Sequence, residues 1–287
     1  MPNKEQKIPF YGIIVITILL FEVLTMIIDT HVHFGAADRF SMPSEVLLES
    51  MKKYKIDYAL VSCIESTEFT CDLEPIPSNT PSRQLSSNEK ALTLVKEHHH
   101  KLKALFWICP NTETFDEKVA SFILENSQHF VGFKMHPYHS DIAISDPRCE
   151  EYLRFAQKHK IPFVVHTAHD EKSHVQHVYH MAKKYPDVNF VMVHMGLGTD
   201  NKQAIEYIAE LDNLYGDTTW VSLENTLMAI EKCGSDKILF GTDSPIDGIA
   251  TYEKYLGLMD GLKRELATKD YENVMFRNAI RLFKLKL

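Results

Sequence analysis

The feature that most constrains the fold of this chain is a regular alternation of short β-branched runs with longer amphipathic stretches, from Met26 onward. Each short run is apolar on both faces, which is typical of parallel strands covered by helices. The predicted strands are Met26–His31, Tyr58–Ile64, Ala104–Ile108, Val131–Met135, Phe163–His166, Phe190–His194, Leu214–Asp217 and Ile238–Gly241. Eight repeats of one strand-and-helix unit favour a distorted (β/α)8 TIM barrel, with an open doubly wound α/β sheet as the alternative.

The stretches between these strands carry apolar residues at three- and four-residue spacing, which predicts amphipathic helices. The predicted helices are Glu45–Tyr54, Asn88–His99, Asp146–His159, Ser173–Tyr185, Asn201–Leu211 and Ser222–Cys233. We expect Ser173 to cap one helix and Gly234 to end another in the left-handed conformation.

Composition narrows the class of protein further. The 287 residues are 45% hydrophobic and 24% charged, which suits one globular barrel domain, predicted over residues 26–287. The net charge of -8 is spread along the chain without a basic patch, so we expect no nucleic-acid partner. The five cysteines are scattered without a C-x-x-C motif, which predicts no disulfide framework and favours a reducing cytoplasm. Homo-oligomer formation stays open.

Residues 1–25 differ in character from the rest of the chain. Lys4 and Lys7 precede an apolar run over residues 8–21, which Glu22 interrupts. No small-residue cleavage site follows, and the run is shorter than the roughly 20 residues of a membrane-spanning helix. We therefore expect an extension outside the fold and a protein away from the membrane, with a membrane anchor through residues 8–21 as the lesser alternative.

One long polar stretch interrupts the rhythm of strands and helices. Residues 65–87, after the second predicted strand, are rich in Pro, Ser, Thr and Asn. A loop of this length inside a compact domain is usually functional or disordered, and active-site loops of barrels grow at this end of the strands. We therefore expect a mobile, lid-like insertion over the site.

The strongest chemical signal is the pair His31 and His33 at the end of the first predicted strand. Alternate side chains of a strand share a face, so these two imidazoles point the same way while Val32 points to the other side. Two imidazoles side by side can form half of a metal site. An isolated His-x-His is also common in loops, so the signal depends on its position after an apolar strand.

Three other predicted strands also end in groups that can bind metal. His166 and His194 each close an apolar run, and Asp243 follows the last run with the spacing of an inward-facing residue. The carboxyl ends of barrel strands meet at the rim where active sites form, so we expect these side chains to converge there. Imidazole and carboxylate together predict one or two divalent ions, Zn²⁺ first, with Mn²⁺ or Fe²⁺ as alternatives.

Several ordered motifs resemble the amidohydrolase superfamily, specifically the amidohydrolase-related branch that includes enzymes similar to aminocarboxymuconate semialdehyde decarboxylase. The motifs are Met26–His33, Gly132–Pro137, Val165–Thr167, Val193–Gly196, Phe240–Pro245 and Asn278–Phe283. The resemblance implies a barrel over residues 26–287 with His31, His33, His166 and Asp243 as metal ligands. It also implies that His194 is a second-metal ligand or a catalytic group, and that Asp243 transfers the proton.

Lys134 has two interpretations. Period two along the fourth predicted strand places Lys134 and His136 toward the barrel interior, with Phe133 and Met135 facing the helices. Burial near a cation lowers the pKa of a lysine, and the neutral amine can capture CO₂. The resemblance to two-metal relatives then implies a carbamate of Lys134 that bridges two ions. The alternative is an ammonium that binds a substrate carboxylate or forms an ion pair.

The remaining histidines fall into two groups. His136, Tyr138, His139 and His169 follow the fourth and fifth predicted strands, so we expect them to contact a small-molecule substrate. The exposed runs are His98–His100 and the helical series His174, His177 and His180. Because a solvated polar stripe explains these runs, we do not expect a metal site there.

The favoured function is a metal-dependent hydrolase in which activated water attacks an amide, lactone or other ester bond of a small molecule. Asp243 would accept the proton of that water, and His194, Lys134 or the metal would polarise the substrate. Two alternatives stay open: a metal-dependent decarboxylase or hydratase of a small carboxylic acid, and a non-catalytic barrel. No phosphate-binding loop or nucleophile elbow occurs in the sequence.

Overall fold

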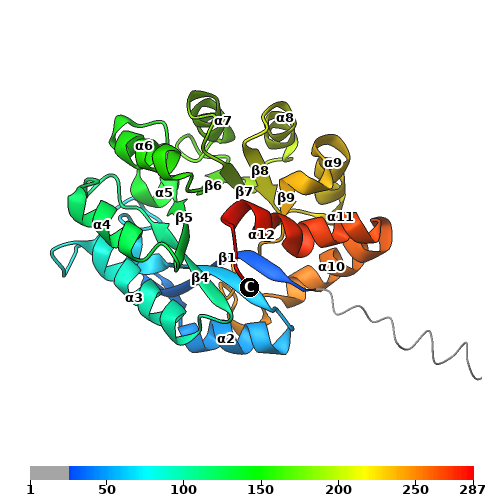
Figure 1. Cartoon of the computed structure of the whole chain (residues 1–287), viewed down its shortest axis with the longest axis horizontal. Coiled ribbons are helices and arrows are strands. Elements are labelled where there is room, and N and C mark those ends of the chain that lie inside the picture. The colour runs from blue at the N-terminus through cyan, green and yellow to red at the C-terminus, as the bar shows by residue number, and fades with distance from the viewer. Residues whose placement is uncertain (1–25) are drawn as a thin grey trace, which may run out of the picture.

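The computed structural model describes residues 26–287, which fold around one curled, mostly parallel sheet (Figure 1). The strand order is β2-β1-β3-β4-β5-β6-β7-β8-β9, and only β2 runs antiparallel to its neighbour. The strands are β1 (Ile28–Ala37), β2 (Phe40–Met42), β3 (Tyr58–Cys63), β4 (Leu102–Trp107), β5 (Phe130–Met135), β6 (Phe163–Ala168), β7 (Phe190–Leu197), β8 (Leu214–Asp217) and β9 (Ile238–Leu239). All eight predicted strands are therefore confirmed.

The two ends of the curled sheet meet through backbone hydrogen bonds. The amide of Thr30 donates to the carbonyl of Phe240, and the amide of Asp243 donates to the carbonyl of His31, both over 2.9 Å. The amide of His33 likewise donates to Ser244 over 2.9 Å. β9 itself is only two residues long, so the segment after it completes the contact with β1. This short closing strand makes the barrel a distorted one.

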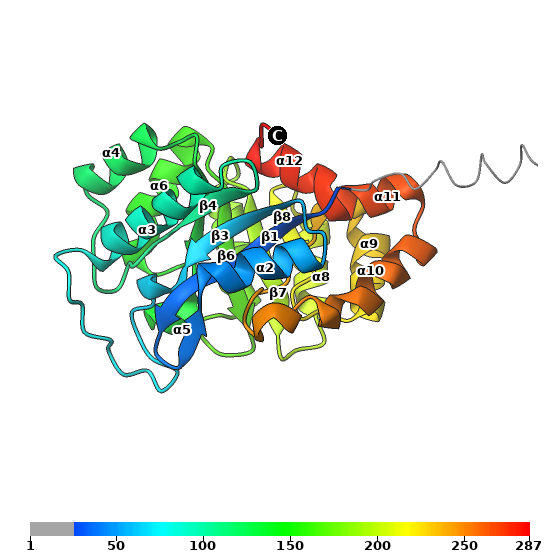
Figure 2. The same ribbon diagram turned by 90° about the horizontal axis from the view of Figure 1, so that it is seen from below.

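Helices surround the sheet on its outer side (Figure 1). They are α2 (Ser44–Lys53), α3 (Arg83–Glu97), α4 (Glu117–Glu125), α5 (Pro137–Ser140), α6 (Glu150–His159), α7 (Val175–Lys184), α8 (Lys202–Glu210), α9 (Leu223–Cys233), α10 (Glu253–Glu265), α11 (Thr268–Glu272) and α12 (Asn278–Phe283). α12 lies at one end of the barrel, whereas α5 and the long loop before α3 lie at the other (Figure 2).

Apolar side chains form two layers. The larger layer lies between the sheet and the helices and contains Phe133 and Met135, as the period-two pattern of β5 predicts. The smaller layer fills the barrel interior and is closed by the last residues of the chain, among them Leu282, Phe283 and Leu285. Gly132 faces this interior: a Cβ there would lie 2.9 Å from Leu105 and 3.3 Å from Phe283. Apolar side chains therefore close the barrel at the amino ends of its strands.

Several elements differ from the prediction. β2 was not predicted, because three residues paired in a hairpin carry no periodic signal. α4, α5, α10 and α11 were also missed, and α3 begins at Arg83 instead of Asn88. Ser173 is not a cap: His174 occupies that position and accepts from the amide of Gln176 over 3.3 Å. Gly234 does follow α9 with a positive φ of 89°, but its ψ of 147° is extended, so it is not the left-handed helical cap that was expected.

The polar stretch 65–87 is tied to the barrel instead of free. Its last residues belong to α3, and the guanidinium of Arg83 donates to the carbonyls of Thr67 and Ile76. The hydroxyl of Tyr138 in α5 donates to the carbonyl of Cys71 over 2.8 Å. The position over the site is as predicted, because Thr67 and Cys71 line the cavity described below. The contacts argue against a mobile lid.

The prediction for residues 1–25, including the anchor over residues 8–21, lies outside the described residues. Within residues 26–287, no helix is long and apolar enough to cross a bilayer. The five cysteines all lie in this part of the chain, and each carries a free thiol, in line with the expected lack of disulfides.

Candidate metal centre

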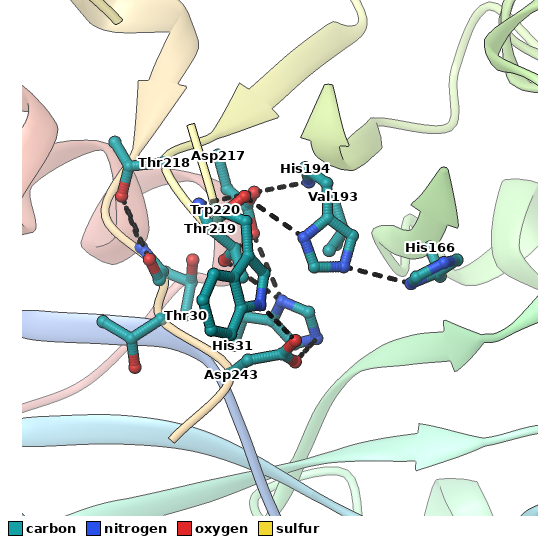
Figure 3. Close-up of polar contacts among 12 residues, drawn as sticks. Thr30, His31, His166, Val193, His194, Asp217, Thr218, Thr219, Trp220 and Asp243 are labelled. Atoms are coloured by element: carbon teal, nitrogen blue, oxygen red, sulfur yellow. Dashed lines mark hydrogen bonds and ion pairs between the residues drawn. The ribbon is translucent and has the colours of Figure 1, made fainter. Parts of the chain in front are cut away.

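The structure brings the sequence-predicted site residues together at the carboxyl ends of the barrel strands (Figure 3). His31 and His33 lie in β1, His166 in β6 and His194 in β7, while Asp243 follows β9. All five residues are at least nine-tenths buried. The convergence follows from parallel strands of similar length, which place their carboxyl ends at one rim.

His31, His33 and Asp243 form the tightest group, which we call the donor trio. The two Nε2 atoms lie 3.0 Å apart, and each is 3.2 Å from Asp243 Oδ1. One ligand atom from each residue lies within 4.8 Å of the others. Two ligand atoms at this separation can both bind one ion at about 2.1 Å.

The outer hydrogen bonds of the trio decide which nitrogens carry protons. The hydroxyl of Thr219 donates to Asp217 Oδ2 over 2.9 Å, so its oxygen accepts from His31 Nδ1, 3.2 Å away. His31 Nδ1 also lies 3.4 Å from Asp217 Oδ2. The proton of His31 is therefore on Nδ1, and Nε2 presents a lone pair to the trio. His33 Nδ1 lies 2.9 Å from Ser62 Oγ, leaving its Nε2 toward the trio as well.

Burial keeps the trio's histidines neutral. It lowers the pKa of His33, and it lowers the pKa of His31 well below its usual range, helped by the nearby Lys134 ammonium. Burial alone would raise the pKa of Asp243, and positive charge on His31 or His33, whenever either ring is protonated, would lower that pKa well below its ordinary value. The trio therefore combines neutral imidazoles with a carboxylate, the protonation states that bind a cation.

His166 and His194 form a second group, which we call the histidine pair. His194 Nδ1 lies 3.1 Å from the carbonyl of Thr219, which can only accept, so Nδ1 carries the proton. His194 Nε2 then accepts from His166 Nδ1 over 3.0 Å, which leaves His166 Nε2 with a lone pair. Burial lowers the pKa of both side chains. The pair lies outside the tight metal-binding group.

Lys134 is fully buried at the edge of the donor trio. Its Nζ lies 2.9 Å from His31 Nε2 and 5.8 Å from the ring of Trp107. Burial lowers the pKa of Lys134 to about 8, against the opposing charges of Asp243 and Asp217. Lys134 is not among the residues that line the cavity, so it reaches the site through His31.

A close backbone approach shapes the floor of the site at Gly241. A Cβ there would lie 2.7 Å from Thr219 Oγ1, 2.8 Å from Asp217 Oδ2 and 3.1 Å from His31 Cβ. Only glycine leaves room for the partners that orient His31. His194 and Asp243 also have left-handed backbones, with φ of 67° and 69°. Strain of this kind persists where the surrounding contacts fix the conformation, as they do at functional sites.

A cavity of about 690 Å³ opens onto the donor trio. His136, Tyr138, His139 and His169, predicted as substrate contacts, all line it. Its wall contains aromatic rings in near-parallel orientation: Trp107 stacks on His136 at 8°, and His136 stacks on His166 at 16°, with ring centroids 6.1 and 3.7 Å apart. His194 lies behind His166 and does not line the cavity.

Sequence reasoning missed three residues that support the site. Asp217 is the last residue of β8, and Thr219 and Trp220 follow it. These three residues contact His31, His194 and Asp243. Asp217 accepts from the amide of His194 over 2.8 Å, and Trp220 donates to Asp243 Oδ2 over 2.9 Å. Asp217 ends a predicted strand exactly as His166 does, so the same rule would have found it.

The donor set fits a divalent ion. Two imidazole lone pairs and a carboxylate oxygen within 3.2 Å of one another repel unless a positive charge lies between them. Imidazole and carboxylate are ligands that Zn²⁺, Mn²⁺ and Fe²⁺ all accept. The predicted metal-binding character is therefore supported by the chemistry of these side chains.

The sequence profile of the amidohydrolase family matches residues 28–285, and the chain belongs to that family. The resemblance seen in the sequence motifs is thereby confirmed. No curated protein matches the sequence.

Solved structures with the same fold share little sequence with this chain. They include a 2,6-dihydroxybenzoate decarboxylase from Rhizobium (17% identity, TM-score 0.67, covering 91% of this chain and 99% of the other). A 5-carboxyvanillate decarboxylase from Sphingomonas paucimobilis has 13% identity and a TM-score of 0.68, covering 91% and 100%. A dihydroxybenzoic acid decarboxylase from Polaromonas sp. JS666, solved with bound manganese, has 15% identity and a TM-score of 0.68, covering 91% and 97%.

These similarities correct the predicted activity. The expectation of a hydrolase acting on an amide, lactone or ester is wrong, because these solved structures are decarboxylases and support the lyase alternative. At such identities the likeness establishes the fold, which agrees with a distorted barrel. A divalent metal is supported, whereas the preference for Zn²⁺ is not confirmed, since the metal in the Polaromonas structure is manganese.

Proposed function

We propose that this protein is a metal-dependent decarboxylase of a small carboxylic acid. The observation that carries the proposal is the donor trio of His31, His33 and Asp243 at the base of a cavity with aromatic walls. We propose these three side chains as metal ligands, with His166 as a fourth, because its Nε2 has a free lone pair and the ring lines the cavity. The fold shared with several decarboxylases points to the same reaction class.

The metal in this proposal is Mn²⁺ ahead of Zn²⁺. Both ions accept imidazole and carboxylate ligands, and Mn²⁺ is the ion bound in the solved Polaromonas decarboxylase. When bound, a divalent ion acts as a Lewis acid that neutralises and polarises an oxygen of the substrate.

The substrate in this proposal is a planar, hydroxylated aromatic acid, the class to which the acids of the solved decarboxylases belong. The near-parallel rings of Trp107, His136 and His166 offer faces on which a flat ring can stack. Tyr138 and His169 line the same cavity and can hydrogen-bond to hydroxyl groups of the ring. A volume of about 690 Å³ lies in the usual range for pockets that hold small molecules.

Proton transfer falls to Asp243 in this proposal. Decarboxylation breaks the bond between the ring carbon and the carboxylate, CO₂ leaves, and a proton joins the same carbon through the electron pair left behind. Asp243 lines the cavity, whereas His194 does not, so of these two groups only Asp243 can reach the substrate; its carboxylate first takes up a proton from solvent and then passes it to the ring carbon. His194 holds His166 in orientation through their hydrogen bond. The proton lost from Asp243 is restored from solvent.

We propose that Lys134 is an ammonium beside the centre, not a bridging carbamate or a direct substrate contact. Without an ion its Nζ donates to His31 Nε2 and is buried away from the cavity; a bound ion would take that lone pair in place of Lys134. A one-ion centre needs no bridging group. Elemental analysis should give one divalent ion per chain, both in the unaltered protein and in a Lys134→Met variant; two ions that fall to one in the variant would support the carbamate instead.

The test of the proposed function is release of labelled CO₂. The full chain is stripped with a chelator, reloaded with Mn²⁺, and incubated with carboxyl-labelled 2,6-dihydroxybenzoate and 5-carboxyvanillate. We expect labelled CO₂, and in D₂O a deuterium on the ring carbon that lost the carboxylate. Chelated protein and a metal-loaded His33→Ala variant should both lose the activity. Full metal loading without CO₂ from a panel of aromatic acids would refute the proposal.

A further inference from the structure

Trp220 connects the cavity to a proposed metal ligand. Its indole Nε1 donates to Asp243 Oδ2 over 2.9 Å (Figure 3). Asp243 Oδ1 lies 3.2 Å from Nε2 of His31 and 3.2 Å from Nε2 of His33. The rest of the ring lines the cavity and is 39% exposed. The Trp220 ring therefore donates to the Asp243 carboxylate with one edge, while its other edge faces the cavity.

The backbone at Trp220 is held in an uncommon conformation. Its φ is 57°, in the left-handed region that a bulky residue adopts only when contacts fix it. Its amide donates to the hydroxyl of Tyr255 over 3.1 Å, and the ammonium of Lys254 lies 4.6 Å from the indole ring. Contacts from α10 thus fix the direction of the indole N–H.

The residues just before Trp220 already orient the other members of the site. Thr219 accepts from His31 and from His194, and Asp217 accepts from the amide of His194. Trp220 adds the contact to Asp243, so one short segment after β8 reaches three groups of the centre. Outer hydrogen bonds of this kind orient metal ligands and raise the affinity for the ion.

We propose that Trp220 is a positioning residue for the metal centre. Its indole N–H occupies Oδ2 of Asp243, so that Oδ1 alone is directed at the ion position between His31 and His33. The inference rests on the proposed function, since it takes Asp243 as a ligand. Loss of the N–H frees the carboxylate to rotate about its χ angles, and metal affinity falls because that freedom is lost again on binding.

The chain offers a matched control, because it contains only two tryptophans and both line the cavity. Trp107 stacks on His136 and lies close to Lys134, whereas the donor to Asp243 is Trp220. Replacing either ring by phenylalanine removes similar apolar area from the same cavity. Only the Trp220→Phe variant removes the hydrogen bond to Asp243.

The first experiment measures Mn²⁺ binding by calorimetry to the full-length protein and to the two variants. We expect Trp220→Phe to weaken Mn²⁺ binding by about ten- to a hundredfold, the usual effect of losing an outer partner of a ligand. Trp107→Phe should stay within about threefold of the unaltered protein. Equal affinities for Trp220→Phe and the unaltered protein would overturn the inference.

A second experiment removes the N–H and keeps the shape of the ring. In the Trp107→Phe background, Trp220 is the only tryptophan and can be replaced biosynthetically by benzothienylalanine, which carries sulfur in place of the N–H. We expect the same loss of Mn²⁺ affinity as in Trp220→Phe. If the Trp220→Phe variant folds poorly, the benzothienylalanine protein provides the test of the hydrogen bond. Unchanged affinity with benzothienylalanine would reject the hydrogen-bond role.

The indole proton gives a readout that does not depend on catalysis. With Zn²⁺ as a diamagnetic probe, the ¹H–¹⁵N indole signal of Trp220 should shift on metal binding in Trp107→Phe, and Asp243→Asn should displace it without metal. An indole signal that shifts neither on metal binding nor in the Asp243→Asn variant would overturn the inference. If the unaltered protein binds no divalent ion, the proposed function fails; if it binds the ion and the Trp220 variants bind equally well, only this inference fails.

Discussion

The donor trio and the histidine pair lie at the same rim of the barrel but differ in arrangement. In the trio, two imidazoles and the Asp243 carboxylate face one another at 3.0 to 3.2 Å, so like-charged lone pairs crowd together. In the pair, His194 accepts from His166 and the rings satisfy each other. Lys134 donates only to His31 Nε2, so the remaining lone pairs of the trio favour a bound cation, whereas the imidazoles of the pair satisfy each other.

The difference indicates that the trio and the pair have different roles. We expect the trio to supply most of the affinity for the ion, because its atoms already have the spacing of ligands on one centre. The pair fixes the tautomer of His166 and presents one nitrogen to the cavity. The following predictions test these roles, from the largest expected effect to the smallest.

Acid should destabilise the metal-free protein through the buried histidines of both the trio and the pair. Burial lowers the pKa of four histidines in the folded, metal-free protein: His31, His33, His166 and His194. In the unfolded chain the same histidines have the ordinary pKa of 6.5. Below pH 6.5 the unfolded chain therefore binds protons that the folded protein does not bind. Folding stability is then lost as pH falls below 6.5, by up to about 1.4 kcal/mol per pH unit for each histidine. Urea unfolding between pH 7.5 and 5.5 measures this slope.

An exposed histidine provides the control for the acid experiment. His100 lies on the surface, so a His100→Gln variant should keep the slope of the unaltered protein. A free energy of unfolding that stays constant from pH 7.5 to 5.5 would show that the buried histidines are not held neutral.

Removing one member of the trio should have the largest effect on the metal. We expect His33→Ala to weaken Mn²⁺ binding by more than about a hundredfold, beyond the range for an outer partner, because a ligand itself is lost. Calorimetry of the metal-free protein measures it, with circular dichroism to verify folding. An affinity within tenfold of the unaltered protein would contradict the assignment of the trio.

Asp217 connects the two groups, because it lies beside His31 Nδ1 and accepts from the amide of His194. Asp217→Asn keeps the shape and removes the negative charge that holds the proton on His31 Nδ1. We expect Mn²⁺ binding to weaken by about ten- to a hundredfold. The same titration measures it, and Asp212→Asn at the amino end of β8 should leave affinity unchanged. No loss in Asp217→Asn would show that His31 needs no outer carboxylate.

His166→Ala should have the smallest effect of the three on metal affinity, about tenfold, because the proposed fourth ligand is lost while the three ligands of the trio still hold the ion. Its ring lies outside the tight group, although one nitrogen faces the cavity. Mn²⁺ calorimetry in parallel with His33→Ala measures the contrast. Equal losses for His166 and His33 would erase the distinction between trio and pair, and would mean that the four ligands act as one set.

Much of the fold could be predicted because its signal is local. β8 ends at Asp217 as expected, and all eight barrel strands appear close to their predicted bounds, except that β1 continues past His31 to Ala37. The elements that were missed have little local pattern: β2 exists only through its pairing with β1, and α5 is a single turn after Pro137. The curling of the sheet rests on hydrogen bonds between residues about 210 positions apart in sequence, such as Thr30 and Phe240.

The site divides in the same way. His31, His33, His166, His194 and Asp243 were predicted because each stands at the end of an apolar run. Thr219 and Trp220 were not, since a hydroxyl and an indole after a strand carry no signal of their own. Their roles depend on a left-handed turn at Trp220 that aims the indole N–H at Asp243.

The sequence by itself determined the alternation of strands and helices, the family, and which side chains would gather at the carboxyl rim, since strand periodicity sets the direction of each side chain. Only the tertiary structure decided which of those groups lie within bonding distance of one ion, which nitrogens carry protons, and that Lys134 reaches the site through His31. Those properties depend on distances of a few tenths of an ångström between residues far apart in the chain, which packing sets and local sequence does not encode.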